Sequence, residues 1–440
     1  MLGYNQRLQE LEAQGRPVRV AVIGAGQMGR GLVAQAAGIR GIRVVAVADV
    51  VPERAVQACR AAGLPDDAIA QPRTVAEARD SVAAGRVAAL SDAHLALELP
   101  DVDVVVEATG SPEAGAALAL AAITQRKHVV MLNAEADATV GRLLHRWASM
   151  AGVVYTGAAG DEPAACKELY DFADGLGFQV VAAGKGKNNP LDVRATPDSV
   201  AERARARGMN PRMLASFVDG SKTMIEMTIL ANATGLVPDR PGMHGPAGGW
   251  DDLVRLFRPR AAGGLLSRTG VVDYARGIAP GVFVVVYSDQ PEVRREMHYL
   301  GMGEGPYFLL HRPFHLCSLE TAASVARAAL DRLPTIVQTG HHAETVAVAK
   351  QPLKAGQRLD GIGGFTVYGR IMAAAEAAAM RALPLGLAGS GATLVRDVAV
   401  DAVITLDDVE LDEGSTLVSL WRLQQSMERT APPKRAAVAS

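Results

Sequence analysis

The sequence of 440 residues has few cysteines, few lysines and few aromatic side chains, and it lacks a long apolar run. Cys59, Cys166 and Cys317 are too few and too widely spaced for a disulfide framework or a thiolate metal cluster, which fits a reducing compartment. Uninterrupted apolar runs stay below the ~18 residues that a membrane-spanning helix needs, and the first residues lack the apolar stretch of a secretion signal. These absences predict a cytoplasmic protein without a membrane segment.

The charges are almost balanced, with 45 basic and 47 acidic side chains. This balance argues against binding to nucleic acids or membrane surfaces, which normally needs a basic excess. Only eight of the basic residues are lysines. Because a compositional bias towards arginine removes lysines from ordinary surface positions, the lysines that remain are worth locating.

Short apolar runs alternate with helix-compatible stretches in the first part of the chain. Such an alternation predicts a parallel sheet covered on both faces, as in a doubly wound Rossmann domain. We place this α/β domain at residues 1–160, with residues 66–100 as a helical insertion. The expected strands are 18–23, 44–48, 103–109, 128–133 and 153–156, and the expected helices are 27–38, one after Pro112 and one that ends at Met150.

The motif GAGQMG, from Gly24 to Gly29, directly follows the first strand and opens a helix. Here the first glycine permits a tight turn, Gly26 lets the backbone approach a pyrophosphate, and Gly29 permits close packing of helix on strand. Asp49 ends the second strand, where a carboxylate binds the adenosine ribose and repels a 2′-phosphate, so NAD is favoured over NADP. The nearby Arg54 leaves NADP open. The other members of the predicted turn are Ala25, Gln27 and Met28.

Two further loops follow strands of the predicted sheet. EATGSPE contains Thr109 and Gly110, over which the nicotinamide half could pass, and MLNAEAD contains Asn133 and Glu135. Because ligands of such sheets bind at the carboxyl ends of the strands, all four are site candidates. Asn133 and Glu135 could instead be ordinary helix-capping residues.

Residues 161–340 form the second expected domain, which begins with an amphipathic helix and a strand. The strand is followed by GKGKNNP, which places Lys185, Lys187, Asn188 and Asn189 in a loop. Ammonium and amide groups on a flexible backbone suit a phosphate, a carboxylate or a developing alkoxide. A solvated turn without a ligand is the alternative.

The segment FVDGSKTMIEM spaces Asp219, Lys222 and Glu226 three and four residues apart, which predicts that they share one face of a helix. A lysine held between two carboxylates could act as a proton shuttle. A surface salt bridge is the alternative.

Oxygen ligands for a loosely held Mg²⁺ or Mn²⁺ could come from Asp161, Glu162 and Glu226. The histidines lack the HExxH spacing of a zinc site. Asp161 and Glu162 also count as substrate-binding candidates, together with His244 and Arg312 from the long polar segments of the second domain.

The last part of the chain predicts a small third domain. A helix is expected at 319–333, which could pack back on the Rossmann domain. Two similar phrases at 348–361 and 395–409 indicate a separate unit at residues 341–430. The tail 431–440 is predicted to be disordered.

Together these motifs resemble the homoserine-dehydrogenase-like oxidoreductases with a carboxy-terminal SAF domain, and within them the deoxyxylulose-phosphate reductoisomerase-like (DRL) enzymes. The resemblance runs from about residue 1 to 425. It is carried by VAVIGAGQMG, DVVVEATGSPE, HVVMLNAEAD, GAAGDEPAACKEL, AGKGKNNP, DGSKTMIEM, ANATGLVPD, GMHGP, SRTGVVDYA and GPYFLLHRPFHL. The resemblance implies a Rossmann domain, an α+β substrate and dimerisation domain, and a small β-clip SAF domain.

For the chemistry, the resemblance implies rearrangement of 1-deoxy-D-xylulose 5-phosphate and hydride reduction to 2-C-methylerythritol 4-phosphate, as in isoprenoid biosynthesis. The substrate would be small and phosphorylated or carboxylated, and the enzyme would be a homodimer. The residues expected to support catalysis are then Glu135, Lys187, Asp219, Lys222 and Glu226, with Lys185, Asn188 and Asn189 binding substrate.

Two departures from the family pattern open an alternative. Glu135 stands where homoserine dehydrogenases have a lysine, and Asp49 favours NAD although the reductoisomerase-like enzymes are expected to take NADPH. The alternative is an NAD-linked dehydrogenase of a polyol, a hydroxy acid or homoserine, without rearrangement. A third interpretation is an NAD(H)-sensing protein whose SAF domain binds a partner.

Overall fold

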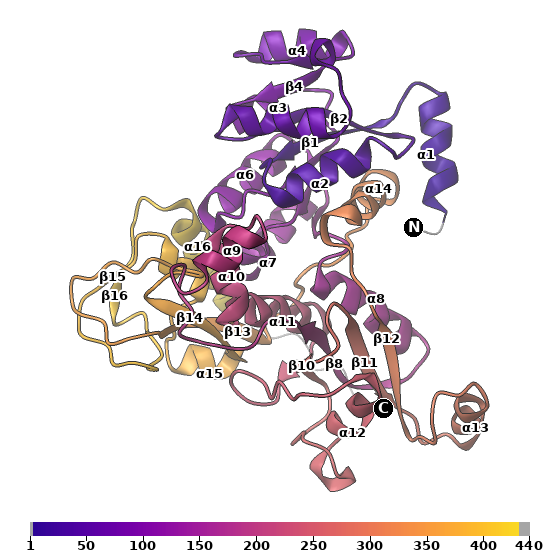
Figure 1. Cartoon of the computed structure of the whole chain (residues 1–440), viewed down its shortest axis with the longest axis vertical. Helices are drawn as coiled ribbons and strands as arrows, with labels where there is room; N and C mark the ends of the chain where they lie inside the picture. The colour runs from indigo at the N-terminus through magenta and orange to yellow at the C-terminus, as the bar shows by residue number, and fades with distance from the viewer. Residues whose placement is uncertain (1–2, 431–440) are drawn as a thin grey trace.

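The computed structural model describes residues 3–430, so the predicted disordered tail lies outside the described residues. Figure 1 shows a sheet domain at the top, a middle domain below it, and a third part at the left. We call the third part, residues 341–430, the C-terminal module.

The sheet domain is built on seven strands in the order β3-β4-β2-β1-β5-β6-β7, and its paired strands run parallel. The strands are continuous apolar runs because separate cores of buried side chains cover the two faces of the sheet. The predicted α/β fold class is confirmed. Its strands are β1 (Val18–Ile23), β2 (Ile42–Ala48), β3 (Ile69–Ala70), β4 (Val87–Leu90), β5 (Val104–Glu107), β6 (His128–Met131) and β7 (Tyr155–Gly157). Its helices are α1 (Tyr4–Ala13), α2 (Gln27–Ala36), α3 (Pro52–Ala61), α4 (Val75–Ala83), α5 (Ala93–Leu97), α6 (Pro112–Thr124) and α7 (Ala134–Met150).

Residues 66–100 are not a helical insertion, contrary to the prediction. They contribute β3 and β4 to the edge of the sheet, and β4 pairs with β2. All four residues of β4 are buried. A four-residue run of valine, alanine and leucine is too short to distinguish strand from helix by periodicity, so only the pairing with β2 decides it.

The middle domain has a mixed sheet in the order β12-β11-β8-β10-β9. Strand β10 runs parallel to β8, whereas β11 runs antiparallel to β8. Helices α8 and α11 pack on this sheet, and α11 is buried along most of its length. The elements are α8 (Glu162–Gly175), β8 (Gln179–Lys187), α9 (Ala201–Ala206), α10 (Pro211–Val218), α11 (Ser221–Thr234), β9 (Val237–Pro238), α12 (Trp250–Leu256), β10 (Val271–Arg276), β11 (Val282–Tyr287), α13 (Pro291–Tyr299) and β12 (Tyr307–Arg312).

The rest of the chain contacts both domains. Helix α14 (Thr321–Asp331) returns to the first sheet and lies against β1, β5 and β6. In the C-terminal module, β13 and β14 pack on α11, and α16 packs on α6 and α7. The module consists of β13 (Ala343–Ala349), β14 (Val367–Ala373), α15 (Ala374–Ala379), β15 (Thr393–Leu394), β16 (Val409–Glu410) and α16 (Thr416–Thr430).

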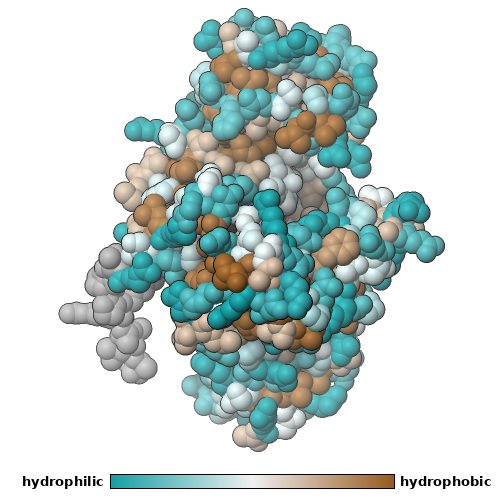
Figure 2. All heavy atoms as spheres, turned by 90° about the vertical axis from the view of Figure 1, so that its left-hand side faces the viewer, coloured by the Kyte–Doolittle hydropathy of each residue, from teal (hydrophilic) through white to brown (hydrophobic). Residues whose placement is uncertain are grey.

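The surface carries scattered apolar side chains, such as Val50, Met150 and Tyr299. The face drawn in Figure 2 likewise mixes small hydrophobic patches with hydrophilic side chains. Within residues 3–430, none of the helices combines the length and the apolar character that crossing a membrane requires.

Glu113 of α6 fixes the start of α16. Its carboxylate accepts hydrogen bonds from the Thr416 and Leu417 N–H groups, at 2.7 and 3.2 Å, and from the Ser415 hydroxyl. We expect Glu113→Ala to lower the free energy of unfolding by about 1–3 kcal/mol, because the first N–H groups of α16 lose a charged acceptor. Urea unfolding measures the change, with Glu53→Ala, at an exposed first-turn position of α3, as the control. Equal losses in the two variants would contradict the capping role.

Candidate active site

The turn between β1 and α2 has the geometry of a dinucleotide site. Gly24 has a φ of +96°, and a Cβ there would lie 2.5 Å from the Ala108 carbonyl oxygen. A Cβ on Gly29 would lie 1.8 Å from the Gly24 oxygen, so this glycine lets α2 pack closely on β1. At Gly26, by contrast, a Cβ would meet open space at the N-terminus of α2. Such an open turn at a helix N-terminus suits a pyrophosphate.

Asp49 lies beside this turn at the end of β2. Its Oδ2 accepts a hydrogen bond from the Ala25 N–H at 2.8 Å, and its Oδ1 accepts one from the Val51 N–H at 2.9 Å. Gln27 and Met28 are exposed at the start of α2. The carboxylate is therefore fixed at the position where dinucleotide-binding sheets contact a ribose.

Asn133 joins the loops that follow β5 and β6. Its Oδ1 accepts the Ala136 N–H at 3.1 Å and so caps α7, while its Nδ2 donates to the Ser111 oxygen at 2.8 Å. Asn133 is thus a helix cap, the alternative that the sequence left open. It also holds the loop that contains Thr109 and Gly110.

Sequence reasoning missed Glu107, the last residue of β5, whose side chain is fully buried. Burial raises the pKa of this carboxyl to about 7, although hydrogen bonds from Thr109 and Asn133 oppose the shift. The Thr109 N–H donates to Glu107 Oε1 at 2.9 Å. An acidic residue at the end of an apolar strand was the signal that could have revealed it.

Lys185 and Lys187 lie on strand β8, although the sequence predicted a loop. The strand continues because β11 pairs with it as far as Lys185 and β10 pairs with it as far as Lys187. Residues two apart on a strand point to the same face, so both side chains lie on one side of the sheet. Asn188 and Asn189 follow the strand, and the Asn189 amide donates to Asn188 Oδ1 at 2.8 Å.

A buried cluster of charged side chains lies between β8, α7, α8 and α11. Lys185 Nζ is 2.6 Å from Glu162 Oε1 and also contacts Glu226. Lys222 Nζ is 3.2 Å from Glu135 Oε1 and 3.8 Å from Glu226 Oε1, so Glu226 bridges the two lysines. We call this group the lysine–carboxylate cluster; its members are Glu135, Asp161, Glu162, Lys185, Lys222 and Glu226.

His315 borders the cluster, although sequence reasoning chose Arg312 in the same segment. His315 Nε2 is 3.4 Å from Glu162 Oε1, and its Nδ1 is 2.9 Å from the Gly160 oxygen. The imidazole therefore adds a third basic group on the Glu162 side.

The carboxyl groups of the cluster differ in their affinity for protons. Burial, together with the charge of Glu162, raises the pKa of Glu226 to about 8, against the effect of the two lysines. Burial also raises the pKa of Asp161 to about 7. Burial would raise the pKa of Glu162 as well, but the ammonium of Lys185 lowers it to about 2. The cluster therefore holds exchangeable protons near neutral pH.

The lysines differ in the same way. Burial would lower the pKa of Lys222, but nearby carboxylates, Glu135 first, raise it above its usual range. Glu162 and Glu226 likewise raise the pKa of Lys185 in spite of burial. Lys187 instead donates to a backbone oxygen, and burial lowers its pKa to about 8. Lys185 and Lys222 therefore stay charged at neutral pH.

Asp219 does not share a helical face with Lys222 and Glu226, contrary to the prediction. It follows the end of α10, and α11 begins only at Ser221, so a helical spacing does not apply across the intervening turn. Its carboxylate lies 2.8 Å from the ammonium of Lys350. The turn between the two helices could not be predicted, because the residues on both sides of it have a helical pattern.

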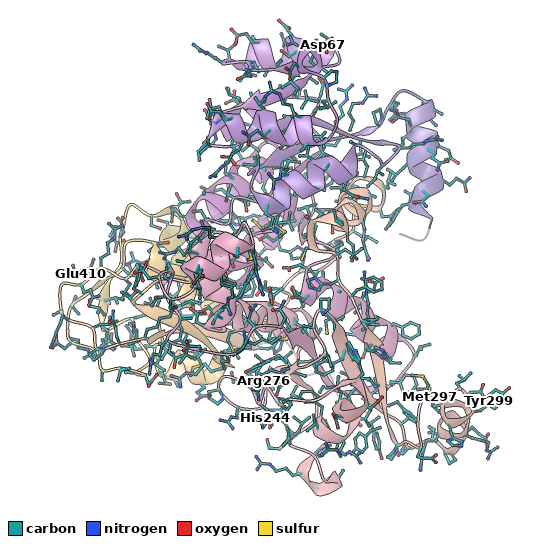
Figure 3. The ribbon with its side chains drawn as sticks, in the orientation of Figure 1. Asp67, His244, Arg276, Met297, Tyr299 and Glu410 are labelled. Carbon is teal, nitrogen blue, oxygen red and sulfur yellow. The ribbon has the colours of Figure 1, made fainter. Side chains whose placement is uncertain are left out.

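The structure gives His244 and Arg312 partners outside the cluster. His244 Nε2 is 2.7 Å from Asp239 Oδ2, and in Figure 3 the residue lies near Arg276 in the middle domain. Arg312 forms an ion pair with Glu320 at 2.5 Å.

Comparison with known protein families agrees with this architecture. Residues 24–156 match the model described as homoserine dehydrogenase, NAD binding domain. Residues 160–321 match the model described as oxidoreductase DRL, catalytic domain. The chain is an NAD-binding oxidoreductase, and its middle domain is similar to the catalytic domain of the DRL oxidoreductases. The resemblance expected from the sequence motifs is thereby confirmed for these two parts, whereas the SAF assignment of the oxidoreductase's C-terminal module stays a prediction.

Several solved structures also match the oxidoreductase at low identity. A probable dehydrogenase from Thermotoga maritima is 15% identical, with 73% of this chain and 91% of that chain covered and a TM-score of 0.42. A putative myo-inositol dehydrogenase from Sinorhizobium meliloti 1021 is 14% identical, with 72% and 87% covered and a TM-score of 0.38. A scyllo-inositol dehydrogenase from Lactobacillus casei, with bound NAD(H) and scyllo-inositol, is 13% identical, with 67% and 76% covered and a TM-score of 0.38. No curated protein matches the chain.

We expect Gly26→Ala to weaken NADH binding by about tenfold or more, because the added methyl group occupies the space through which a pyrophosphate approaches the backbone. The melting temperature should stay close to that of the wild type, since the Cβ meets open space. NADH fluorescence titration and a thermal melt measure the two quantities. Gly175→Ala, where the Cβ also meets open space at the end of α8, is the matched control. If both variants bound NADH as tightly as the wild type, the pyrophosphate would have to lie elsewhere.

Proposed function

We propose that this oxidoreductase transfers a hydride between NAD(H) and a CH–OH group of a small hydroxylated substrate, at the lysine–carboxylate cluster. The ion pair between Lys222 and Glu135 carries the proposal. Glu135 lies in the first turn of α7, directly after β6, and so at the carboxyl end of the parallel sheet. Ligands of such sheets bind at this edge, which puts the ammonium of Lys222 next to the expected nicotinamide position.

Lys222 would exchange a proton with the substrate oxygen. Its ammonium can donate to the oxygen of a carbonyl as an alkoxide develops, and can accept the proton again in the reverse direction. Glu226, 3.8 Å away and with a raised pKa, would replace that proton. Lys185 and Glu135 would hold these two groups in place. Bound NAD(H) supplies the hydride chemistry.

The dinucleotide would bind across the glycine turn and the loops after β5 and β6. The residues proposed to contact it are Gly24, Ala25, Gly26, Gln27, Met28, Gly29, Asp49, Thr109, Gly110 and Asn133. A 2′-phosphate would face the fixed carboxylate of Asp49, so we propose NAD rather than NADP.

The charge balance of the cluster favours an uncharged reacting group in the substrate. Four carboxyl groups face two lysines, and Lys185 is already held by Glu162 and Glu226. Glu162 and Glu135 already pair with the two lysines, and loss of the protons of Asp161 and Glu226 near pH 7 to 8 makes the cluster more negative, so neither ammonium is left to bind a phosphate or carboxylate. An anionic group, if the substrate has one, would have to lie towards Lys187, which is the last residue of the same strand and has no carboxylate partner at ion-pair distance within residues 3–430.

The reductoisomerase reaction on deoxyxylulose phosphate is the second candidate. The match of residues 160–321 to the DRL catalytic domain supports it. It would need the phosphate to bind near Lys187, Asn188 and Asn189. A homodimer and a SAF role for the C-terminal module belong to the same proposal.

A divalent cation does not fit the cluster as it is arranged. Oxygen atoms of Asp161, Glu162 and Glu226 lie within 4.8 Å of one another, which is a suitable donor set for Mg²⁺ or Mn²⁺. The ammonium of Lys185, however, lies between Glu162 and Glu226 and takes the place that a cation would need. We therefore assign no step to a metal.

A substrate panel separates the candidate functions. NAD⁺ reduction is measured with polyols, hydroxy acids and homoserine, and NADPH oxidation with 1-deoxy-D-xylulose 5-phosphate. Turnover of uncharged polyols with NAD⁺ is the expected result. Turnover only with the phosphate and NADPH would favour the reductoisomerase reaction, and NADH binding without any turnover would favour the NAD(H)-sensing alternative.

We expect Lys222→Met to lower kcat by about 10²–10⁴, the usual cost of losing a positioned acid or base. The affinity for NADH should change little, because the glycine turn is untouched. Steady-state kinetics and NADH titration measure the two effects. Lys354→Met, at an exposed lysine paired with Asp397, is the control and should keep wild-type turnover. Turnover of Lys222→Met within about threefold of the wild type would rule out its proton-transfer role.

The raised pKa of Glu226, about 8, predicts opposite pH dependences for the two reaction directions. Carbonyl reduction consumes a proton, so its kcat/KM should fall as the pH rises through about 8 and the carboxyl group becomes ionised. Alcohol oxidation releases a proton, so its kcat/KM should rise over the same range. Glu226→Gln should remove this limb of both profiles, whereas Glu410→Gln, at an exposed residue of the C-terminal module, should keep it. A limb that persists in Glu226→Gln would assign the titration to another group.

A further inference from the structure

Helix α11 is held by the C-terminal module along the side that faces away from the cluster. Ser221, Thr228 and Asn232 are seven and four residues apart, so they share one face of the helix, whereas Lys222 and Glu226 lie on another. The three residues bind the module at the start, middle and end of the helix. Their partners are the Gly369 N–H at 2.8 Å, the Thr345 hydroxyl at 2.8 Å and the Ala343 oxygen at 3.1 Å.

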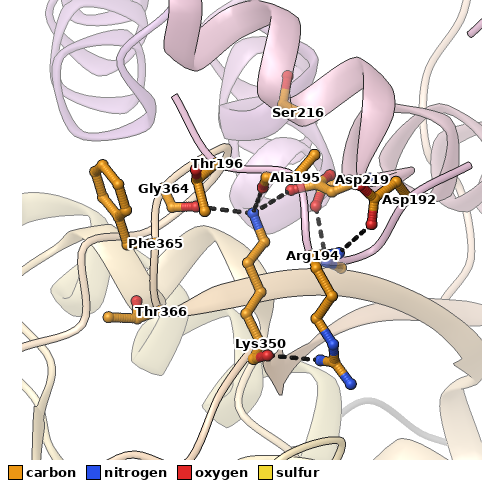
Figure 4. Close-up of polar contacts among 12 residues, drawn as sticks. Asp192, Arg194, Ala195, Thr196, Ser216, Asp219, Lys350, Gly364, Phe365 and Thr366 are labelled. Carbon is orange, nitrogen blue, oxygen red and sulfur yellow. Dashed lines mark hydrogen bonds and ion pairs between the residues drawn. The ribbon is translucent and has the colours of Figure 1, made fainter. Parts of the chain in front are cut away.

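Lys350, the residue after β13, makes a further link from the module to the residues before α11 (Figure 4). Its Nζ donates to the Ala195 oxygen at 2.6 Å and to the Gly364 oxygen at 2.8 Å. It also forms an ion pair with Asp219 Oδ2 at 2.8 Å. The other carboxylate oxygen of Asp219 accepts the Ser221 N–H at 2.8 Å, at the first residue of α11.

The ammonium of Lys350 joins the two segments next to the elements that carry Lys185 and Lys222. Ala195 belongs to the loop that follows β8, the strand of Lys185. Asp219 lies two residues before the start of α11, the helix of Lys222. Lys350 and Asp219 are 3% and 1% exposed, so the pair is shielded from water, and loss of either partner leaves a buried unpaired charge.

We infer that Lys350 is a positioning residue for the reaction: it fixes the start of α11 and thereby the place of Lys222 and Glu226. Lys350 contacts neither of them, so it acts through Asp219 and Ser221. The inference rests on the proposed function of the cluster. A displacement of a proton-transferring group by about 1 Å can cost about 10²-fold in rate, so a loosened helix start is enough to reduce turnover.

The test uses the full chain with Lys350→Met. We expect kcat to fall by about tenfold or more with the best substrate of the panel, while the affinity for NADH stays within about twofold. Amide hydrogen exchange should become faster over residues 219–227 before it changes elsewhere in the middle domain. Arg194→Met is the matched control, because this partly exposed arginine joins the same loop to the module through Asp401 and does not contact Asp219.

Unchanged exchange over residues 219–227 in Lys350→Met would overturn the inference, as would unchanged turnover. The double variant Lys350→Met/Asp219→Asn restores the charge balance without the link. The double variant should regain stability but not turnover. If it regained both, Lys350 would serve only to neutralise the charge of Asp219. If Lys350→Met does not fold, the double variant decides, because it removes the ion pair without leaving a buried unpaired charge: wild-type exchange over residues 219–227 together with wild-type turnover in that variant would overturn the inference. Wild-type turnover of Lys222→Met would refute the proposed function separately.

Discussion

The ion pairs that Glu226 makes with the buried Lys185 and the partly buried Lys222 constrain the rest of the site. An ammonium or carboxylate that loses its partner in such surroundings costs about 3–5 kcal/mol, so the elements that carry the charges cannot move independently. Lys185 comes from a strand and Lys222 from a helix, and both reach the same carboxyl group. The relative position of β8 and α11 is therefore fixed by charge as well as by apolar packing.

The same principle joins the three parts of the chain. The bond between Lys222 and Glu135 connects the middle domain to the carboxyl edge of the parallel sheet. The pair of Lys350 and Asp219 connects the C-terminal module to the start of α11. Because α16 also packs on α6 and α7, the module contacts both of the domains that contribute residues to the candidate site. The module therefore helps to hold the elements of the candidate site in place.

The sequence predicted the parts of this structure that depend on local patterns. The glycine turn and the buried strands of the sheet follow from neighbouring residues. The scarcity of lysine drew attention to Lys185, Lys187 and Lys222, and of these only Lys185 and Lys222 lie in the lysine–carboxylate cluster. The strand at Lys187 could not be predicted, because the hydrogen bonds that extend β8 come from β10 and β11, far along the chain. The link from Lys350 to Asp219 likewise joins distant segments, and no spacing in the sequence reveals it.

The geometry also explains why these positions keep lysine in a chain that otherwise uses arginine. An ammonium is compact and directs its donors to three sides, whereas a guanidinium is planar and donates as a fork. Lys350 needs the first arrangement, because Ala195, Gly364 and Asp219 surround its nitrogen. The nitrogen of Lys185 likewise lies between carboxylates from two helices. A guanidinium also cannot give up its proton at physiological pH, so arginine in place of Lys222 would lose the proton transfer proposed for that residue.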